Sequence, residues 1–409
     1  MLSIEGNIVT HNGVFRKRVE IDPTTFLISK VAEPTGSATF VYTDELIFPG
    51  FIDLHVHARE DVSHKNDYKE DFATASEASI NGGVVAYGEM PNTPVPPIDD
   101  ASYEARKVLT EKSKVEVMLY AGIGPHTKPL STKVPYKVFM GHSVGELFFT
   151  TLTELEQVIS QYSGEHISFH AEDPEIMETH KDETTHGQKR PVEAESSAID
   201  FAIRLIEKYN LIGKICHAST IEAVNKITEA KKRGVRVTME VTPHHLYFDE
   251  TMFGASLPIE LQVNPPIRGT RENRLAMIEA LRDGRIDYLA TDHAPHTIEE
   301  KKKGISGLTH LDTYGAFTTW LMKEHGFRPE DILRVCSDSP GKFIGEFVGK
   351  KYGKIQEGYM GSLTVINMNS PTKVTRDFLK TKSKWSPFLD TEFPGKVIQT
   401  IIKGEVYEH

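Results

Sequence analysis

The sequence predicts an α/β fold, a (β/α)8 TIM barrel with a small β-sandwich domain formed by both chain termini. Two observations carry this prediction. Eight apolar runs of β type alternate with helical stretches through the middle of the chain, which is the pattern of a parallel barrel. Both ends of the chain contain only short strand-like segments and turns, and neither end alone could bury a two-sided core.

The small domain is expected to combine residues 1–48 with residues 355–409. The N-terminal part reads as short strands, and Asn12-Gly13 is a hairpin-type turn signal. Two strand-like runs near the C-terminus, at 362–368 and 396–403, supply further strands. The barrel is then expected over residues 49–354.

The barrel elements follow in chain order. The expected strands are at 46–54, 84–90, 115–122, 136–140, 167–169, 214–216, 235–241 and 286–290. Helices are expected between several of them, at 71–80, 101–112, 153–160, 193–208, 220–233 and 270–282. An open doubly wound sheet is the alternative, but no G-x-G-x-x-G follows a strand, so its dinucleotide-binding form loses support.

Composition excludes several classes of protein. Hydrophobic residues make up 39% and charged residues 26% of 409 residues, which is ordinary for a globular chain and not for a disordered one. The net charge of −11 argues against a broad basic surface for nucleic acid. No apolar run approaches the ~18 residues of a membrane span, and no secretory signal is evident. Two cysteines exclude a disulfide scaffold and favour the cytoplasm.

The 18 histidines are the first unusual feature. His55 and His57 are two positions apart directly after an expected strand, and on a strand such a pair points to one face. Two imidazoles on one face suit a divalent metal. Two hydrogen-bonded histidines at a strand end are the alternative.

Three later clusters strengthen the metal interpretation. His170, His217 and Asp292 each follow a strand-like run. Each alone could be a structural residue or a helix cap. Together with the first pair they supply four histidines and a carboxylate, a set that can hold one or two zinc-like ions.

Lys137 lies on the fourth run. An ammonium group cannot bind a cation, but a lysine that reacts with CO2 becomes a carbamate that could bridge two metals. An exposed or ion-paired lysine is the alternative that the residues alone favour.

Eight segments occur in an order and spacing that we identify with a known family. They are PGFIDLHVHAR (49–59), MPNT (90–93), YKVFMG (136–141), HAED (170–173), ICHAST (215–220), VTPHHL (241–246), VNPPIRG (263–269) and ATDHAPH (290–296). The chain resembles the cyclic-amidohydrolase branch of the amidohydrolase superfamily, most closely its dihydroorotases. The resemblance covers almost the whole chain.

The resemblance implies two divalent metal ions, most typically Zn²⁺. His55, His57 and Asp292 correspond to the ligands of the more buried ion, and His170 and His217 to those of the second. Lys137 corresponds to the lysine that is carboxylated in many members, although some dihydroorotases use an aspartate there.

The resemblance also implies a substrate site. Arg59, Asn92 and His296 correspond to the residues that hold the substrate carboxylate, and Asn264 to a contact with the substrate ring. A salt bridge from Arg59 to a neighbouring acid, Glu60 or Asp61, is the alternative. The family often has Pro-Gly where this chain has Asp61-Val62, which leaves the shape of that loop open. No role is assigned to His142, and His244 and His245 are expected to be structural or to support residues that bind the metals.

The function implied is dihydroorotase activity, the reversible hydrolysis of L-dihydroorotate to N-carbamoyl-L-aspartate in pyrimidine synthesis. Asp292 would act as general base and then as general acid. The alternatives are another cyclic amidase (a hydantoinase, dihydropyrimidinase or allantoinase) and a catalytically silent relative that serves as an assembly subunit. The expected partner is a small-molecule substrate, without nucleic acid or membrane, and homo-oligomer formation is left open.

Overall fold

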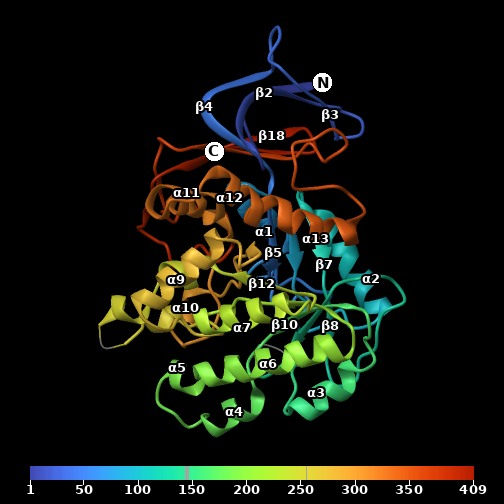
Figure 1. Ribbon diagram of the computed structural model, residues 1–409, viewed down its shortest axis with the longest axis vertical. Coiled ribbons are helices and arrows are strands. Elements are labelled where there is room, and N and C mark those ends of the chain that lie inside the picture. Colours follow the sequence, from blue (N-terminus) through green and yellow to red (C-terminus); the bar gives the residue numbers. More distant parts are fainter. Residues whose placement is uncertain (143–146, 255) are drawn as a thin grey trace.

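The computed structural model describes residues 1–142, 147–254 and 256–409. Figure 1 shows two regions along the long axis, an upper sheet that contains both chain termini and a lower body of strands surrounded by helices. The lower body is the parallel barrel that the alternating pattern predicts.

The upper sheet has seven strands in the order β18-β17-β14-β4-β1-β2-β3. These strands are β1 (Leu2–Thr10), β2 (Gly13–Ile21), β3 (Ile28–Ala32), β4 (Phe40–Pro49), β14 (Leu363–Asn367), β17 (Lys396–Ile402) and β18 (Glu405–Glu408). Strand β1 pairs in parallel with β4 and antiparallel with β2. Apolar residues of both chain ends, including Ile4, Val19, Val365 and Ile401, form a core cluster of their own. The expected small β domain is therefore one continuous sheet, and its boundaries at 48/49 and 354/355 stay a prediction.

The barrel strands pair in parallel around the lower body. They are β5 (Phe51–Val56), β6 (Val84–Glu89), β7 (Glu116–Leu119), β8 (Ala121–Ile123), β9 (Tyr136–Phe139), β10 (His166–His170), β11 (Ile212–Ile215), β12 (Val237–Val241) and β13 (Tyr288–Leu289). A parallel bridge between Val56 and His293 joins the end of β5 to the segment after β13. This bridge closes the ring of strands.

Two expected strands are divided in the structure. The run at 46–54 ends in the upper sheet at Pro49 and resumes in the barrel at Phe51. Gly50 lies between them, where a Cβ atom would come within 2.4 Å of the Val85 side chain, so only glycine fits at this crossing. The run at 115–122 divides at Tyr120, because β7 pairs with β6 whereas β8 pairs with β9. The apolar pattern could not show either change of partner.

Helices follow most barrel strands. The longer ones are α1 (Phe72–Asn81), α2 (Asp100–Leu109), α3 (Leu152–Ile159), α6 (Val192–Lys208), α7 (Ile221–Lys232), α9 (Arg271–Arg282), α11 (Tyr314–His325) and α13 (Ser339–Val348). The shorter ones are α4 (Pro174–Thr179), α5 (His186–Lys189), α8 (Pro243–Tyr247), α10 (Ile298–Lys301) and α12 (Pro329–Leu333). Helices α11, α12 and α13 lie directly below the upper sheet (Figure 1). Within the described part of the chain, no helix combines the length and the apolar character needed to cross a membrane.

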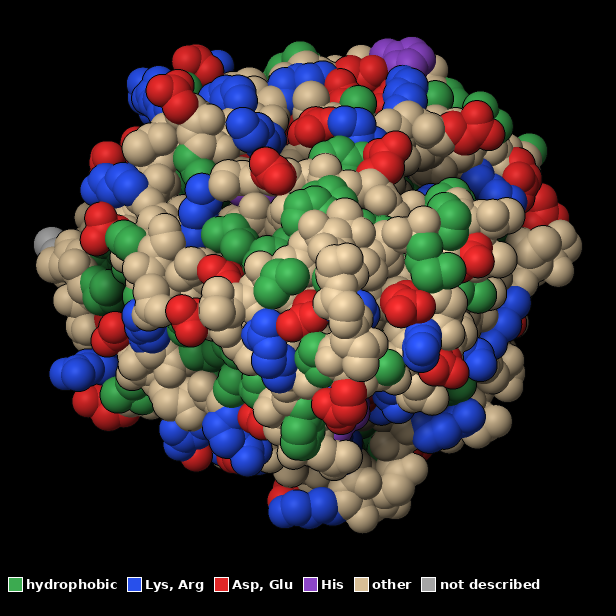
Figure 2. Space-filling model, turned by 90° about the horizontal axis from the view of Figure 1, so that it is seen from above, with side chains coloured by type: hydrophobic (Ala, Val, Ile, Leu, Met, Phe, Trp, Pro, Cys, Tyr) green, Lys and Arg blue, Asp and Glu red, His purple; other side chains and the backbone are tan. Residues whose placement is uncertain are grey.

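The molecular surface mixes charges of both signs. Figure 2 shows the face above the upper sheet, where Lys and Arg side chains lie among Asp and Glu side chains. Hydrophobic side chains occur there in small groups. This distribution agrees with the net charge of −11 and shows no broad basic area on that face.

Candidate active site

Six of the expected site residues lie on barrel strands or directly after them. They are His55 of β5, His57 directly after β5, Lys137 of β9, His170 of β10, His217 after β11 and Asp292 after β13, and all six are buried. The carboxyl ends of parallel barrel strands meet at one mouth. The topology therefore gathers these residues from distant parts of the sequence.

The carboxylate of Asp292 lies close to both histidines of the first pair, His55 and His57. Its Oδ1 atom lies 3.0 Å from Nε2 of His57 and 3.2 Å from Nε2 of His55. Single ligand atoms of His55, His217 and Asp292 also lie within 4.8 Å of one another. Two imidazole nitrogens and a carboxylate oxygen thus converge on one small volume.

The second histidine pair faces the same volume. Nδ1 of His170 lies 2.9 Å from Nε2 of His217. The other ring nitrogen of His170, Nε2, lies 2.8 Å from Oε2 of Glu172, which fixes the ring orientation. Glu172 is in turn paired with Arg190. Outer partners of this kind orient histidines that bind metals.

The electrostatics keep these histidines neutral. Burial lowers the pKa of His55 to about 3. Burial also holds the pKa values of His57 and His217 well below their ordinary value, and lowers the pKa of His170 against the opposing Glu172 carboxylate. Neutral imidazole is the form that binds metals. Buried, neutral nitrogens that face one another beside a carboxylate fit a divalent cation.

Lys137 is fully buried, and no carboxylate of the described residues forms an ion pair with it. Its Nζ atom lies 2.8 Å from the Sγ atom of Cys216 and 5.2 Å from the centre of the Phe139 ring. The alternative of an exposed or ion-paired lysine is therefore wrong. A buried ammonium group that forms no direct ion pair is a costly arrangement.

Glu240 and Lys214 are further residues of the site, which the sequence analysis did not single out. Glu240 of β12 accepts a hydrogen bond from Nδ1 of His55, and its other oxygen lies 2.5 Å from Nζ of Lys214. Burial raises the pKa of Glu240, but the Lys214 ammonium and His55 outweigh it and hold this pKa well below its ordinary value. The sequence does contain a signal for both residues, because each is a charged residue inside a largely apolar strand, Lys214 in β11 and Glu240 in β12.

Three site residues have left-handed backbone conformations. The φ angles are 65° for Arg59, 36° for His217 and 50° for Asp292. Such conformations cost of order 1–3 kcal/mol for residues other than glycine and persist where surrounding contacts fix them. Their presence at three positions around one pocket marks a functional site.

Arg59 and Asn92 lie beside the histidines. Oδ1 of Asn92 lies 2.7 Å from Nδ1 of His57. Arg59 is buried, and burial lowers its pKa to about 10. The alternative salt bridge is absent among the described residues, since Glu60 pairs with Lys112 and Asp61 accepts hydrogen bonds from Ser63 and Val95.

His296 lies behind Arg59. Its Nε2 atom is 3.2 Å from Nη2 of Arg59, while its Nδ1 atom faces Lys69 at 3.3 Å and Glu300 at 3.4 Å. Burial and the neighbouring Arg59 charge lower the pKa of His296, so that Nε2 can accept the Arg59 hydrogen bond. His296 does not line the pocket, in contrast to Asn264.

These residues surround a pocket with an empty volume of about 380 Å³. Its lining consists of His55, His57, Arg59, Asn92, Phe139, His170, His217, Val263, Asn264, Asp292, Ala294, Ser306 and Gly307. The Oδ1 atom of Asn264 is buried and has no hydrogen-bond partner among the described residues. It is therefore available to a ligand. The pocket combines a cluster suited to a metal with one buried guanidinium group.

The three motif histidines to which no site role was assigned, His142, His244 and His245, have other surroundings. His244 lies 3.2 Å from His310, and His245 contacts Thr242 and the Pro265 carbonyl. The His142 ring lies against Phe148 in a neighbouring cavity. None of the three lines the pocket.

Comparison with known proteins agrees with this arrangement. A profile of the amidohydrolase family matches residues 46–407. The chain is 33% identical to a dihydroorotase of Thermococcus kodakarensis, with 99% of this chain and 94% of that protein covered. It is 31% identical to a dihydroorotase of Listeria monocytogenes, with 92% and 91% covered. The structure of an L-hydantoinase (dihydropyrimidinase) from Arthrobacter aurescens superimposes with a TM-score of 0.88 at 23% identity, covering 100% of this chain and 96% of that one.

The chain belongs to the amidohydrolase family. Within that family it is similar in sequence to proteins named dihydroorotase. The likeness to the hydantoinase structure shows the shared fold, a parallel barrel with a separate sheet made of the chain ends.

Proposed function

We propose that this chain is a dihydroorotase, which catalyses the reversible hydrolysis of L-dihydroorotate to N-carbamoyl-L-aspartate in pyrimidine synthesis. The observation that carries the proposal is Arg59, a buried guanidinium group in the pocket wall without a carboxylate partner among the described residues. A buried cation of this kind calls for an anionic ligand. Dihydroorotate carries a carboxylate, and Arg offers a planar fork that matches it.

The proposed centre would hold two divalent ions, and the nitrogen and oxygen donors of its side chains suit Zn²⁺. His55, His57 and Asp292 would hold one ion, and His170 and His217 the other. Lys137 would bridge them as a carbamate formed with CO2. When bound, such ions lower the pKa of a water molecule and polarise a carbonyl oxygen.

The side chains of the pocket would bind the substrate and transfer the proton. Arg59, Asn92 and Asn264 bind the carboxylate and the ring, and His296 holds Arg59 in place. Asp292 accepts a proton from the attacking water as the new C–O bond forms. It returns that proton to the ring nitrogen as the C–N bond breaks, so one residue serves as base and then as acid. The reverse sequence closes the ring and releases water.

A panel of cyclic amides tests this proposal. Purified protein supplied with zinc should hydrolyse dihydroorotate, and hydantoin, dihydrouracil and allantoin should be poor substrates. Another cyclic amidase is the second candidate, which the hydantoinase fold neighbour favours. Turnover of an uncharged ring in place of dihydroorotate would establish it. A catalytically silent relative would turn over none of the four.

A further inference from the structure

The proposed carboxylate site, which rests on the proposed function, is supported by buried residues outside the pocket. Arg59 and Asn92 lie on different loops, one after β5 and the other after β6. Neither loop is held by regular strand pairing at these positions. The backbone of Arg59 is also in the left-handed region, at a φ of 65°. Some other contact must fix the two loops relative to each other.

A buried ion pair supplies the first contact. Oε2 of Glu89 accepts a hydrogen bond of 2.7 Å from the backbone N–H of Ala58, the residue before Arg59. Oε1 of the same carboxylate lies 2.6 Å from Nη2 of Arg106 on α2. The other arm of Arg106 donates to Oγ1 of Thr93, the residue after Asn92. One ion pair thus connects the immediate neighbours of Arg59 and Asn92.

Asp61 supplies the second contact between the same loops. Its Oδ2 atom accepts a hydrogen bond of 2.8 Å from the backbone N–H of Val95, and its Oδ1 atom one of 2.7 Å from that of Ser63. Asp61 is 2% exposed, so water competes little with these bonds.

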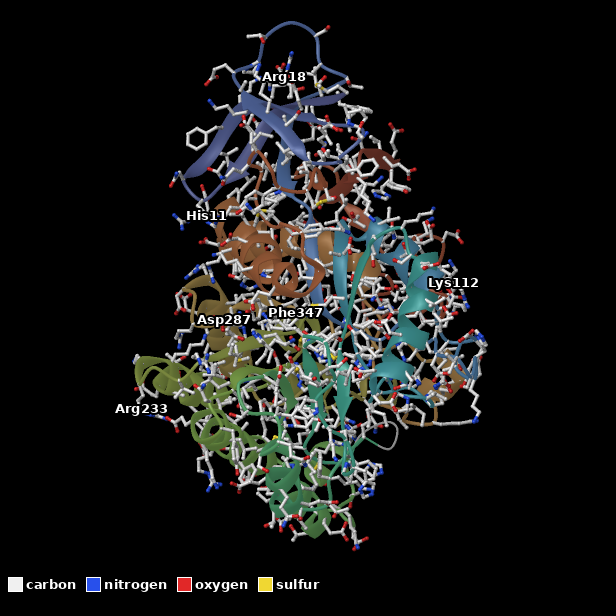
Figure 3. All side chains as sticks on the ribbon, turned by 90° about the vertical axis from the view of Figure 1, so that its right-hand side faces the viewer. His11, Arg18, Lys112, Arg233, Asp287 and Phe347 are labelled. Carbon is white, nitrogen blue, oxygen red and sulfur yellow. The ribbon has the colours of Figure 1, made fainter. Side chains whose placement is uncertain are left out.

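The loop carrying Arg59 is also held on its outer side. Glu60 accepts a hydrogen bond from the backbone N–H of Phe72 and pairs with Lys112, which projects from the side of the barrel in Figure 3. This contact positions the loop on the barrel, but it does not reach Asn92. Besides the His57–Asn92 contact at the pocket, the two loops are therefore joined by Asp61, Glu89 and Arg106.

We infer that Asp61, Glu89 and Arg106 form a brace that sets the spacing between Arg59 and Asn92 and thereby determines affinity for ring substrates that carry a carboxylate. The three brace residues do not line the pocket, so they act as positioning residues. The brace is rigid because it is buried, charged and hydrogen-bonded at both ends. Losing it should loosen the carboxylate site and leave the histidine cluster in place.

The test compares Asp61→Ala and Arg106→Lys with the unaltered holoenzyme. Arg106→Lys keeps the charge but cannot reach Glu89 and Thr93 together. We expect each variant to raise KM for dihydroorotate about tenfold and to change kcat less than about threefold, since ground-state binding is lost rather than transition-state stabilisation. Zinc content and any slow turnover of dihydrouracil, the same ring without a carboxylate, should stay unchanged.

Asp99→Ala is the matched control. Asp99 ends the loop after β6 and caps the N-terminus of α2, the helix that carries Arg106, and its carboxylate accepts hydrogen bonds from Ser102 of that helix. This variant should lower the melting temperature without raising KM.

Three results would contradict the proposed role of the brace. One is an unchanged KM in both folded brace variants. The second is an equal loss of activity on dihydroorotate and dihydrouracil. The third is an increase of KM in Asp99→Ala as large as in the brace variants. A wild-type enzyme that neither binds nor turns over dihydroorotate would contradict the proposed function itself, which distinguishes the two failures.

Discussion

The carboxylate of Asp292 lies 3.0 Å from Nε2 of His57, although 235 positions separate the two residues in the sequence. The same oxygen lies 3.2 Å from Nε2 of His55. Asp292 also faces the pocket that Arg59 and Asn264 line. Its carboxylate is therefore placed to contact both a metal ion and a substrate.

Replacing Asp292 with asparagine should abolish most activity. The change keeps the size of the side chain and an oxygen for the metal, but it removes the base. We expect kcat to fall by at least the ~10²–10⁴-fold typical of general acid–base catalysis. Steady-state kinetics alongside metal analysis measure this. A near-normal kcat with the metal content intact would assign the proton transfer to another residue.

Replacing Lys137 with alanine should remove the bridging anion. We expect the paired metals and most activity to be lost, with partial recovery on adding short carboxylic acids such as acetate or propionate. Cys216→Ala is the control, because it removes the hydrogen-bond partner of the lysine amine without removing the amine. An electron-density map with an unmodified lysine beside two fully occupied metals would refute the carbamate.

Glu240→Gln should weaken metal binding without touching a ligand. Glu240 orients His55 through Nδ1 and balances the Lys214 charge. Loss of such an outer partner costs roughly 10–100-fold in metal affinity, which competition with a zinc chelator measures. Glu195→Gln is the matched control, since Glu195 is also a buried barrel carboxylate but bonds Ser219 and Thr220. Equal affinities in the two variants would remove Glu240 from the site.

Lys301 should make stability depend on pH. It is fully buried, its Nζ atom donates to the carbonyls of Gln262 and Ile305, and burial lowers its pKa to about 7 from the ordinary 10.5. Between these values the unfolded chain binds the proton and the folded protein does not. The contribution of Lys301 to the free energy of unfolding therefore rises with pH, by up to about 1.4 kcal/mol per pH unit.

Urea unfolding of wild type and Lys301→Met at about pH 7.5 and about pH 9 measures this effect, with a gain for wild type of about 2 kcal/mol relative to the variant. Lys302→Met is the control, because Lys302 is exposed and should show no such trend. A difference between wild type and Lys301→Met that stays constant with pH would mean that Lys301 keeps its proton throughout this range.

The sequence predicts the barrel and the neighbourhood of its site well, because both depend on local patterns. His55, His170, His217 and Asp292 could be placed near one another because each follows an apolar run and parallel strands share one mouth. The change of partner strand at Tyr120 could not be predicted, because the apolar run continues across it.

The supporting residues depend on contacts between distant segments. Glu240 meets His55 across 185 positions, and Asp61 meets Val95 across 34. In the sequence nothing indicates which distant residue Glu240 or Asp61 contacts, so neither contact could be predicted. The position of His296 behind Arg59, and not in the pocket wall, likewise depends on how two loops pack.

The most direct test of the account is the ratio of kcat/KM for dihydroorotate to kcat/KM for dihydrouracil, measured in wild type and in Arg59→Ala. The guanidinium group should matter only for the ring that carries a carboxylate, since a charged, bidentate bond is worth more than a neutral one. We predict that wild type favours dihydroorotate by several orders of magnitude and that Arg59→Ala loses most of that preference through a higher KM for dihydroorotate, with dihydrouracil turnover little changed. A wild-type protein that hydrolyses hydantoin, dihydrouracil or allantoin efficiently and leaves dihydroorotate untouched would contradict the proposed dihydroorotase activity.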